Sequence, residues 1–138
     1  MAWTGVKTNW LPTDYFNVVD YNRVVGNLEY LRGLASELFE EITFTDVPST
    51  KTVNDKILPS EMTAIENNLY LLNTKTYQLS KYEIGEKKRY KGNGKTHNYE
   101  DMNRIEDAII RLYNLMTAHK ASLPRLAITL GGQKGFKV

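Results

Sequence analysis

The residues that most invite a chemical interpretation are five consecutive ones, Gly92-Asn93-Gly94-Lys95-Thr96. The last three match the end of a phosphate-binding loop, in which glycine amides and a lysine surround a phosphate group. Such a loop also needs a glycine five residues before its Gly-Lys pair, where this chain has Arg89, and an apolar strand before it, where the chain is charged. The stretch is therefore interpreted as a tight turn around Asn93-Gly94 and not as a nucleotide site.

The loop that contains this turn is basic and rich in tyrosine, a mixture typical of surfaces that bind nucleic acid. Its basic residues are Lys87, Lys88, Arg89, Lys91 and Lys95. The whole chain has 18 basic and 16 acidic side chains, so its net charge of +2 provides no molecule-wide attraction for nucleic acid. We expect a solvated loop, or one that contacts an acidic protein, and we keep nucleic-acid binding as an alternative.

Groups that could perform catalysis are sparse. The two histidines, His97 and His119, have no companions at metal-ligand spacing, and no nucleophile stands beside a base. We expect His97 at a helix boundary and His119 near a helix end. There is no cysteine, which excludes disulfides and thiolate metal sites. Most acids are expected on polar helix faces, so we predict a protein that is not an enzyme, with no catalytic residues, metal or cofactor.

The elements that must position these residues are three copies of one helical motif, repeated with a period of about 40 residues. The copies read NVVDYNRVVGNLEYL from Asn17, LPSEMTAIENNLYLL from Leu58 and NYEDMNRIEDAIIRL from Asn98. Aligned aliphatic residues follow at intervals of four and three, which is the spacing of one helix face. They are Val24, Ile65 and Ile105; Leu28, Leu69 and Ile109; and Leu31, Leu72 and Leu112. The pattern predicts helices near 17–42, 58–80 and 98–120.

The predicted helix starts carry capping signals. Asn17 and Asn98 are favourable N-cap residues with an acid three positions on, and Pro59 suits the first position of a helix. Two surface ion pairs are expected three residues apart on the helices, Asp20 with Arg23 and Asp101 with Arg104.

The 138 residues suffice for one domain, and we predict an all-α fold. It is a three-helix bundle from a threefold internal helical repeat, with long linkers and, as an option, a small β element in the C-terminal run 126–130. We divide the chain into an N-terminal aromatic arm (1–16), a three-helix domain (17–120) and a C-terminal interaction tail (121–138). No apolar stretch reaches the roughly 18 residues of a membrane span, and no signal peptide is visible, so we expect a protein that does not contact membranes.

Both ends of the chain are expected to be adhesive. The aromatic arm could be a strap that covers the bundle or an anchor buried in a neighbouring subunit, and the C-terminal run could add as a strand to another subunit. The predicted assembly interface consists of Trp3, Trp10, Tyr15, Phe16, Leu126, Ile128, Leu130 and Phe136.

The phrase Asp101-Met-Asn-Arg-Ile-Glu, with Asp20-Tyr-Asn-Arg-Val and the preceding stretch 10–17, resembles a recurrent helical segment of phage proteins. These are the tail, baseplate and receptor-binding proteins of phages that infect Gram-positive bacteria. In that segment a tryptophan and turn residues lead into an acid, Asn, often Arg, and then Ile-Glu. The resemblance covers 15 residues in each copy, and the second copy departs from it at Thr63 and Ala64.

What the resemblance implies is a virion structural protein of the tail or baseplate, assembled in the host cytoplasm. It would be a homo-oligomer that contacts other tail or baseplate proteins. Two alternatives are a nucleic-acid-binding accessory protein that uses the basic loop 87–95, and a small regulatory helical protein.

Overall fold

The computed structural model describes residues 3–45, 49–91 and 97–129, and for 124–129 it describes the backbone alone. Over these ranges the chain forms helices and no strand. The helices are α1 (Val18–Leu38), α2 (Pro59–Thr74), α3 (Lys81–Ile84) and α4 (Tyr99–Thr129). The predicted all-α class is confirmed.

The long helices begin where the capping signals predict. The side-chain oxygen of Asn17 accepts a hydrogen bond from the Asp20 amide at 3.2 Å, and the Asp20 carboxylate accepts one from the Asn17 amide at 3.1 Å. Asn98 and Asp101 form the same reciprocal pair before α4, and Pro59 occupies the first position of α2. These contacts satisfy amides that would otherwise have no partner at a helix start.

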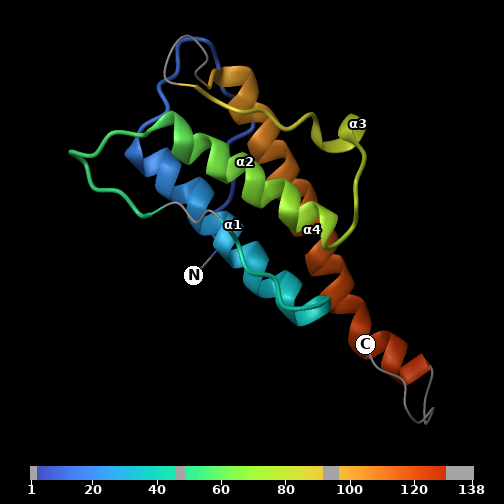
Figure 1. The fold of residues 1–138 in the computed structure, drawn as a ribbon. Helices are drawn as coiled ribbons and strands as arrows, with labels where there is room; N and C mark the ends of the chain where they lie inside the picture. The colour runs from blue at the N-terminus through green and yellow to red at the C-terminus, as the bar shows by residue number, and fades with distance from the viewer. Residues whose placement is uncertain (1–2, 46–48, 92–96, 130–138) are drawn as a thin grey trace.

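The three long helices lie side by side and run in the same direction (Figure 1). Each begins at the upper left of the view, and each contacts the other two. Parallel neighbours require the chain to return along the full length of the helices between one helix and the next. The long connections before α2 and α4 serve this purpose, and the short α3 lies at the start of the second return.

The predicted stripe lies at the centre of the core. All nine aligned aliphatic residues are at most 2% exposed, and the stripe continues in α4 through Met116, which is fully buried. Burial of one such side chain contributes on the order of 1.5–3 kcal/mol. The helices therefore gain their stability from their shared apolar face.

Two helices end earlier than predicted. α1 stops at Leu38 because the chain then turns so that Ile42 and Phe44 pack into the core, at 2% and 6% exposure. α2 stops at Thr74 because the Asn73 side chain binds the backbone of Leu79, with its amide donating to the carbonyl at 3.0 Å and its oxygen accepting from the N–H at 2.9 Å. In both places a tertiary contact replaces continued helix.

The third long helix extends further than predicted. α4 continues through Pro124 to Thr129, so the helix end predicted near residue 120 is wrong, and the proposed boundary between the three-helix domain and the C-terminal tail falls within this helix. The β element predicted at 126–130 is not shown, since 126–129 are helical and residue 130 lies outside the described residues. A proline removes only one helix hydrogen bond, and the leucines and alanines around it are good helix formers.

A layer of aromatic rings closes the core at the end opposite the helix starts. Phe39 follows α1, Tyr77 follows α2 and His119 lies in α4, with ring centroids 5.2 to 6.3 Å apart. The Tyr77 hydroxyl is 3.2 Å from His119 Nδ1. His119 is thus a packing residue within α4, and its predicted position near a helix end is wrong.

Candidate functional site

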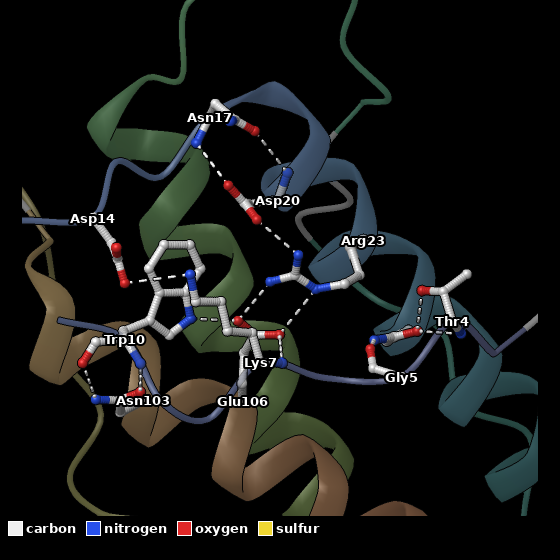
Figure 2. Close-up of polar contacts among 11 residues, drawn as sticks. Thr4, Gly5, Lys7, Trp10, Asp14, Asn17, Asp20, Arg23, Asn103 and Glu106 are labelled. Carbon is white, nitrogen blue, oxygen red and sulfur yellow. Dashed lines mark hydrogen bonds and ion pairs between the residues drawn. The ribbon is translucent and has the colours of Figure 1, made fainter.

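The most densely connected polar group is the carboxylate of Glu106, which is fully buried between α1 and α4 (Figure 2). The Arg23 guanidinium of α1 reaches it with two nitrogens, Nε to Oε1 at 3.1 Å and Nη2 to Oε2 at 2.7 Å. The Trp10 indole N–H donates to Oε2 at 2.7 Å, and the Lys7 amide donates to Oε1 at 3.1 Å. We call this arrangement the Glu106 site.

Full pairing explains how a carboxylate can be buried here. An ionised carboxylate offers about four acceptor positions, and four donors from the same chain occupy them at Glu106. Asp20 holds the other side of Arg23 at 2.7 Å, as predicted from their spacing. Burial works against the charged guanidinium, but Glu106 and Asp20 outweigh it and raise the pKa of Arg23.

Trp10 belongs to this site and not to an assembly surface. Its side chain is only 3% exposed, and its backbone N–H and C=O pair with the Asn103 side chain at 2.7 and 3.1 Å. The ring is already covered within its own chain, so it cannot also be buried in a neighbour. At Trp10 the arm therefore lies against the helices of its own chain, which is the arrangement of the strap alternative.

The rest of the arm also contacts the helices. The Trp3 ring stacks on Tyr113 of α4 with centroids 3.9 Å apart, and Phe16 packs on Trp10 and His97. Tyr15 is 89% exposed. Among the described aromatic residues predicted to join subunits, Tyr15 alone is mostly exposed to solvent.

A second buried carboxylate, Glu66 of α2, lies in a matching environment. It is fully buried, and it pairs with the Nη2 atom of Arg104 in α4. The Tyr90 hydroxyl donates to Oε2 at 2.6 Å, and the Lys88 amide donates to Oε1 at 3.3 Å. We call this the Glu66 site. Glu66 and Glu106 are both exceptions to the expectation that most acids lie on polar helix faces.

The predicted ion pair between Asp101 and Arg104 does not form. Asp101 binds the Lys88 ammonium at 2.6 Å instead, because the extended chain before α4 brings Lys88 to it. Two buried nitrogens of Arg104, Nε and Nη1, have no hydrogen-bond partner among the described residues.

The two sites hold the extended segments of the chain in the same way. Thr63, three residues before Glu66, binds the backbone of Tyr90 with its hydroxyl: it accepts from the N–H at 2.9 Å and donates to the carbonyl at 3.4 Å. Asn103, three residues before Glu106, binds the Trp10 backbone. In both cases the aromatic side chain of the bound residue then donates to the glutamate. Burial and the bond to Glu66 raise the pKa of the Tyr90 hydroxyl.

A third set of contacts repeats the backbone pairing without a buried acid. Asn22 of α1 accepts from the Lys51 N–H and donates to its carbonyl, both at 2.8 Å. The residue three positions after Asn22 is the apolar Val25. In place of an aromatic donor, Lys51 extends its ammonium to Glu61 at 2.7 Å.

The basic loop is only partly available for binding. Lys87, Arg89 and Lys91 are exposed, Lys88 is paired with Asp101, and Lys95 lies outside the described residues. The Gly92–Thr96 turn lies outside them as well. Among the predicted C-terminal interface residues, Leu126 and Ile128 lie in the part of α4 where only the backbone is described. Leu130 and Phe136 lie outside the described residues.

An open groove of about 830 Å³ lies between the start of α1 and the chain at 51–57, with Val19, Val53 and His97 in its lining. Among the described residues, no group of three or more acids and histidines could hold a metal ion. None of the described helices is long and apolar enough to cross a membrane.

Sequence reasoning did not find the glutamate sites, although a signal was present. The aligned copies place Glu66 and Glu106 at one position and Asn22, Thr63 and Asn103 at another. A charged residue directly after a core isoleucine lies at the edge of the apolar face, where it can be covered by another segment. The partners, however, come from segments 22 to 99 residues away.

No protein-family model matches this chain, and comparisons with curated proteins and with solved structures find no match either.

Proposed function

We propose that this chain is a structural protein of a phage virion, a tail or baseplate component that mediates subunit assembly. Its domain is a three-helix bundle built from a threefold internal helical repeat. The proposal combines the resemblance of the Asp-x-Asn-Arg-Ile-Glu phrase to phage tail segments with the roles those residues have in the fold.

The observation that carries the proposal is a cyclic set of equivalent contacts. In each copy the residue aligned with Asn22 holds the segment that leads into the next helix: Asn22 of α1 holds Lys51 before α2, Thr63 of α2 holds Tyr90 before α4, and Asn103 of α4 holds Trp10 before α1. Equivalent contacts at the same aligned position in all three copies are what a threefold internal repeat predicts.

The ion pairs follow a ring in the opposite direction. Arg23 of α1 binds Glu106 of α4, and Arg104 of α4 binds Glu66 of α2. The third pair would join the aligned positions of α2 and α1, where the chain has Ala64 and Val25. Both partners of that pair are replaced by apolar residues, which avoids leaving one buried charge alone.

This use of the polar residues supports a structural role over a catalytic one. The carboxylates that are best sheltered from water are occupied by arginine, indole, phenol and amide donors of the same chain. They hold the extended segments against the helices. A rigid scaffold of this kind suits a particle component.

The threefold repeat is tested by introducing an ion pair at the aligned positions 25 and 64, where the chain has Val25 and Ala64. Val25→Glu and Ala64→Arg should each lower the free energy of unfolding by about 3 kcal/mol, because each buries an unpaired charge. The double variant should lose at least about 1.5 kcal/mol less than the sum, as measured by urea unfolding. Val25→Glu combined with Ala118→Arg, an exposed position far along α4, is the control and should be additive. Additive losses in both pairs would contradict the repeat.

The virion role is tested by mass spectrometry of purified particles from the phage or prophage that encodes the chain. We expect the protein at a fixed copy number in the particles, with antibody labelling at the tail or its tip in electron micrographs. Abundant protein in the producing cells but none in the particles would overturn the assignment.

A further inference from the structure

The open groove of about 830 Å³ lies at the end of the bundle where the three long helices begin (Figure 1). We call it the end groove. Its lining includes Phe16, Ile57 and His97, each of which directly precedes one of the three aligned copies and is half-buried. Phe16 and Ile57 also pack against the core. The end groove is therefore an opening onto the outermost layer of the core, to which all three copies contribute.

Large apolar side chains are exposed in and beside the end groove. Val19 and Val53 line it and are 74% and 88% exposed. Tyr15, which directly precedes the lining residue Phe16, is 89% exposed, and Leu58 at the start of α2 is 50% exposed. An apolar patch that surrounds a groove is typical of a surface that binds another protein.

The charges of the end groove balance. Among the described residues, its charged lining side chains are Lys51, Asp55 and Lys56, and Lys51 binds Glu61 at 2.7 Å. The Asp55 carboxylate accepts hydrogen bonds from the N–H and the hydroxyl of Thr52 at 2.6 and 3.0 Å. Two positive and two negative side chains cancel, so the groove does not attract nucleic acid or an anionic membrane. An uncharged, largely apolar occupant fits it best.

We propose that the end groove binds the Tyr15 side chain of a second copy of this chain, and that the two copies pack head to head about a twofold axis. Tyrosine combines a large apolar ring with one hydroxyl and is a common anchor at protein interfaces. Tyr15 does not fill the groove of its own chain, because its ring is exposed while Phe16 beside it lines the groove.

The closeness of anchor and groove favours a second copy over an unrelated partner. A twofold interface requires a surface that is complementary to itself, so that the anchor of each copy meets the groove of the other. Here an exposed aromatic ring and an open apolar groove belong to adjoining residues of one chain. An unrelated protein that filled the groove would leave Tyr15 without a partner surface.

The apolar area sets the expected strength of the dimer. Each copy contributes one tyrosine, which buries roughly 150–250 Å², together with two valines and one leucine. Such an interface lies near the lower limit of specific interfaces, about 1,200 Å² in total, so we expect a dissociation constant in the micromolar range.

Sedimentation velocity of the full chain from about 1 to 200 µM tests the proposal. We expect a monomer–dimer equilibrium whose dissociation constant changes less than threefold between about 0.05 and 0.5 M salt, because the contact is apolar. Tyr15→Ala should raise the dissociation constant at least tenfold. Tyr82→Ala removes an equally exposed ring from α3, at 91% exposure, and should change it less than twofold.

Three results would overturn the proposal: a monomer over the whole concentration range, equal effects of the two tyrosine variants, or a dimer that dissociates with salt. Species larger than a dimer would contradict the twofold arrangement. Circular dichroism establishes that both variants remain folded.

Disulfide trapping tests the contact itself, because the chain contains no cysteine. A Tyr15→Cys chain mixed with a Val53→Cys chain should form a disulfide-linked heterodimer in oxidised glutathione. The other contact of the pair, Tyr15 of the Val53→Cys chain in the intact groove, still holds the two copies together. A mixture of Tyr82→Cys with Val53→Cys is the control and should be linked at least tenfold more slowly. Equal rates of linkage, measured by mass spectrometry, would exclude Tyr15 as the occupant.

This inference rests on the assembly role proposed above and adds its partner and geometry. The tests separate the two. A monomeric chain that is nevertheless present in virions would overturn the dimer alone, whereas a dimer that is absent from virions would overturn the virion role alone.

Discussion

The Glu106 and Glu66 sites are built on aligned positions of α4 and α2, yet the two glutamates receive different numbers of hydrogen bonds. Glu106 receives four donors, two of them from Arg23. Glu66 receives three, only one of them from Arg104, which keeps two buried nitrogens without partners among the described residues. The aligned acids explain the difference: Asp20 supports Arg23, whereas Asp101 is bound by Lys88. The segment that covers each ion pair thus decides whether all of its hydrogen-bonding groups are satisfied.

The largest expected effect comes from removing the two glutamates. Glu106→Ala should lower the free energy of unfolding by about 4 kcal/mol, because it leaves the Trp10 indole N–H, the Lys7 amide and two nitrogens of the partly buried Arg23 guanidinium without acceptors. Glu66→Ala should lower the free energy of unfolding by about 3 kcal/mol, because fewer donors lose their acceptor at Glu66 than at Glu106. Urea unfolding followed by circular dichroism measures both.

Asp107→Ala removes the exposed carboxylate next to Glu106 and is the matched control for this pair. Partial burial raises the pKa of Asp107, and Arg111 opposes this shift. Because the residue is largely exposed, loss of its charge should change the free energy of unfolding by less than about 0.5 kcal/mol. Equal losses for Glu106→Ala and Asp107→Ala would contradict the importance of the Glu106 site.

A glycine pair isolates the packing around Arg104. Gly5 and Gly85 both have a backbone φ of +82°, where a side chain is strained. A Cβ at Gly5 meets open space, but one at Gly85 would collide with the Arg104 side chain. Gly5→Ala should therefore cost about 1 kcal/mol and Gly85→Ala about 2–3 kcal/mol. Equal melting temperatures for the two variants would show that Arg104 moves freely and that the Glu66 site is loose.

Tyr90→Phe removes one donor from the Glu66 site and leaves the ring in place. We expect a loss of about 1–2 kcal/mol, since a buried carboxylate loses a hydrogen bond. The variant should also change how stability depends on pH above 10. The folded chain holds the Tyr90 proton above its ordinary pKa of 10.0, so stability is lost as the pH rises past that value, and the phenylalanine variant should lose this component. Identical pH profiles above 10 would contradict the assignment.

The smallest expected effect concerns His97, whose ring packs against Phe16 and Tyr90 and so lies between the segments that serve the two sites. Burial lowers the pKa of His97 below 6.5, although Asp101 opposes the shift. The unfolded chain therefore binds a proton more readily, and stability should decline by about 1 kcal/mol or less as the pH falls below 6.5. In His97→Gln the decline between pH 7 and 5.5 should become shallower; an unchanged slope would exclude His97 as its source.

The sequence by itself determined the helices and their core. Spacings of four and three residues, capping at Asn17 and Asn98, and Pro59 at a helix start are local properties, and each of these predictions is confirmed. The Asp20–Arg23 pair is local in the same sense, because two residues three apart on a helix are neighbours whatever surrounds them.

Only the tertiary structure decided where the helices end and what the polar residues do. Asn73 stops α2 by binding Leu79, and Lys88 takes Asp101 away from Arg104. Trp10 could be a strap or an anchor in the sequence, and its bond to Glu106 across 96 residues decides for the strap. The physical reason is the same in each case: a buried polar group must find a partner, and here the partner lies on an extended segment outside the group's own helix, which the helix pattern does not reveal.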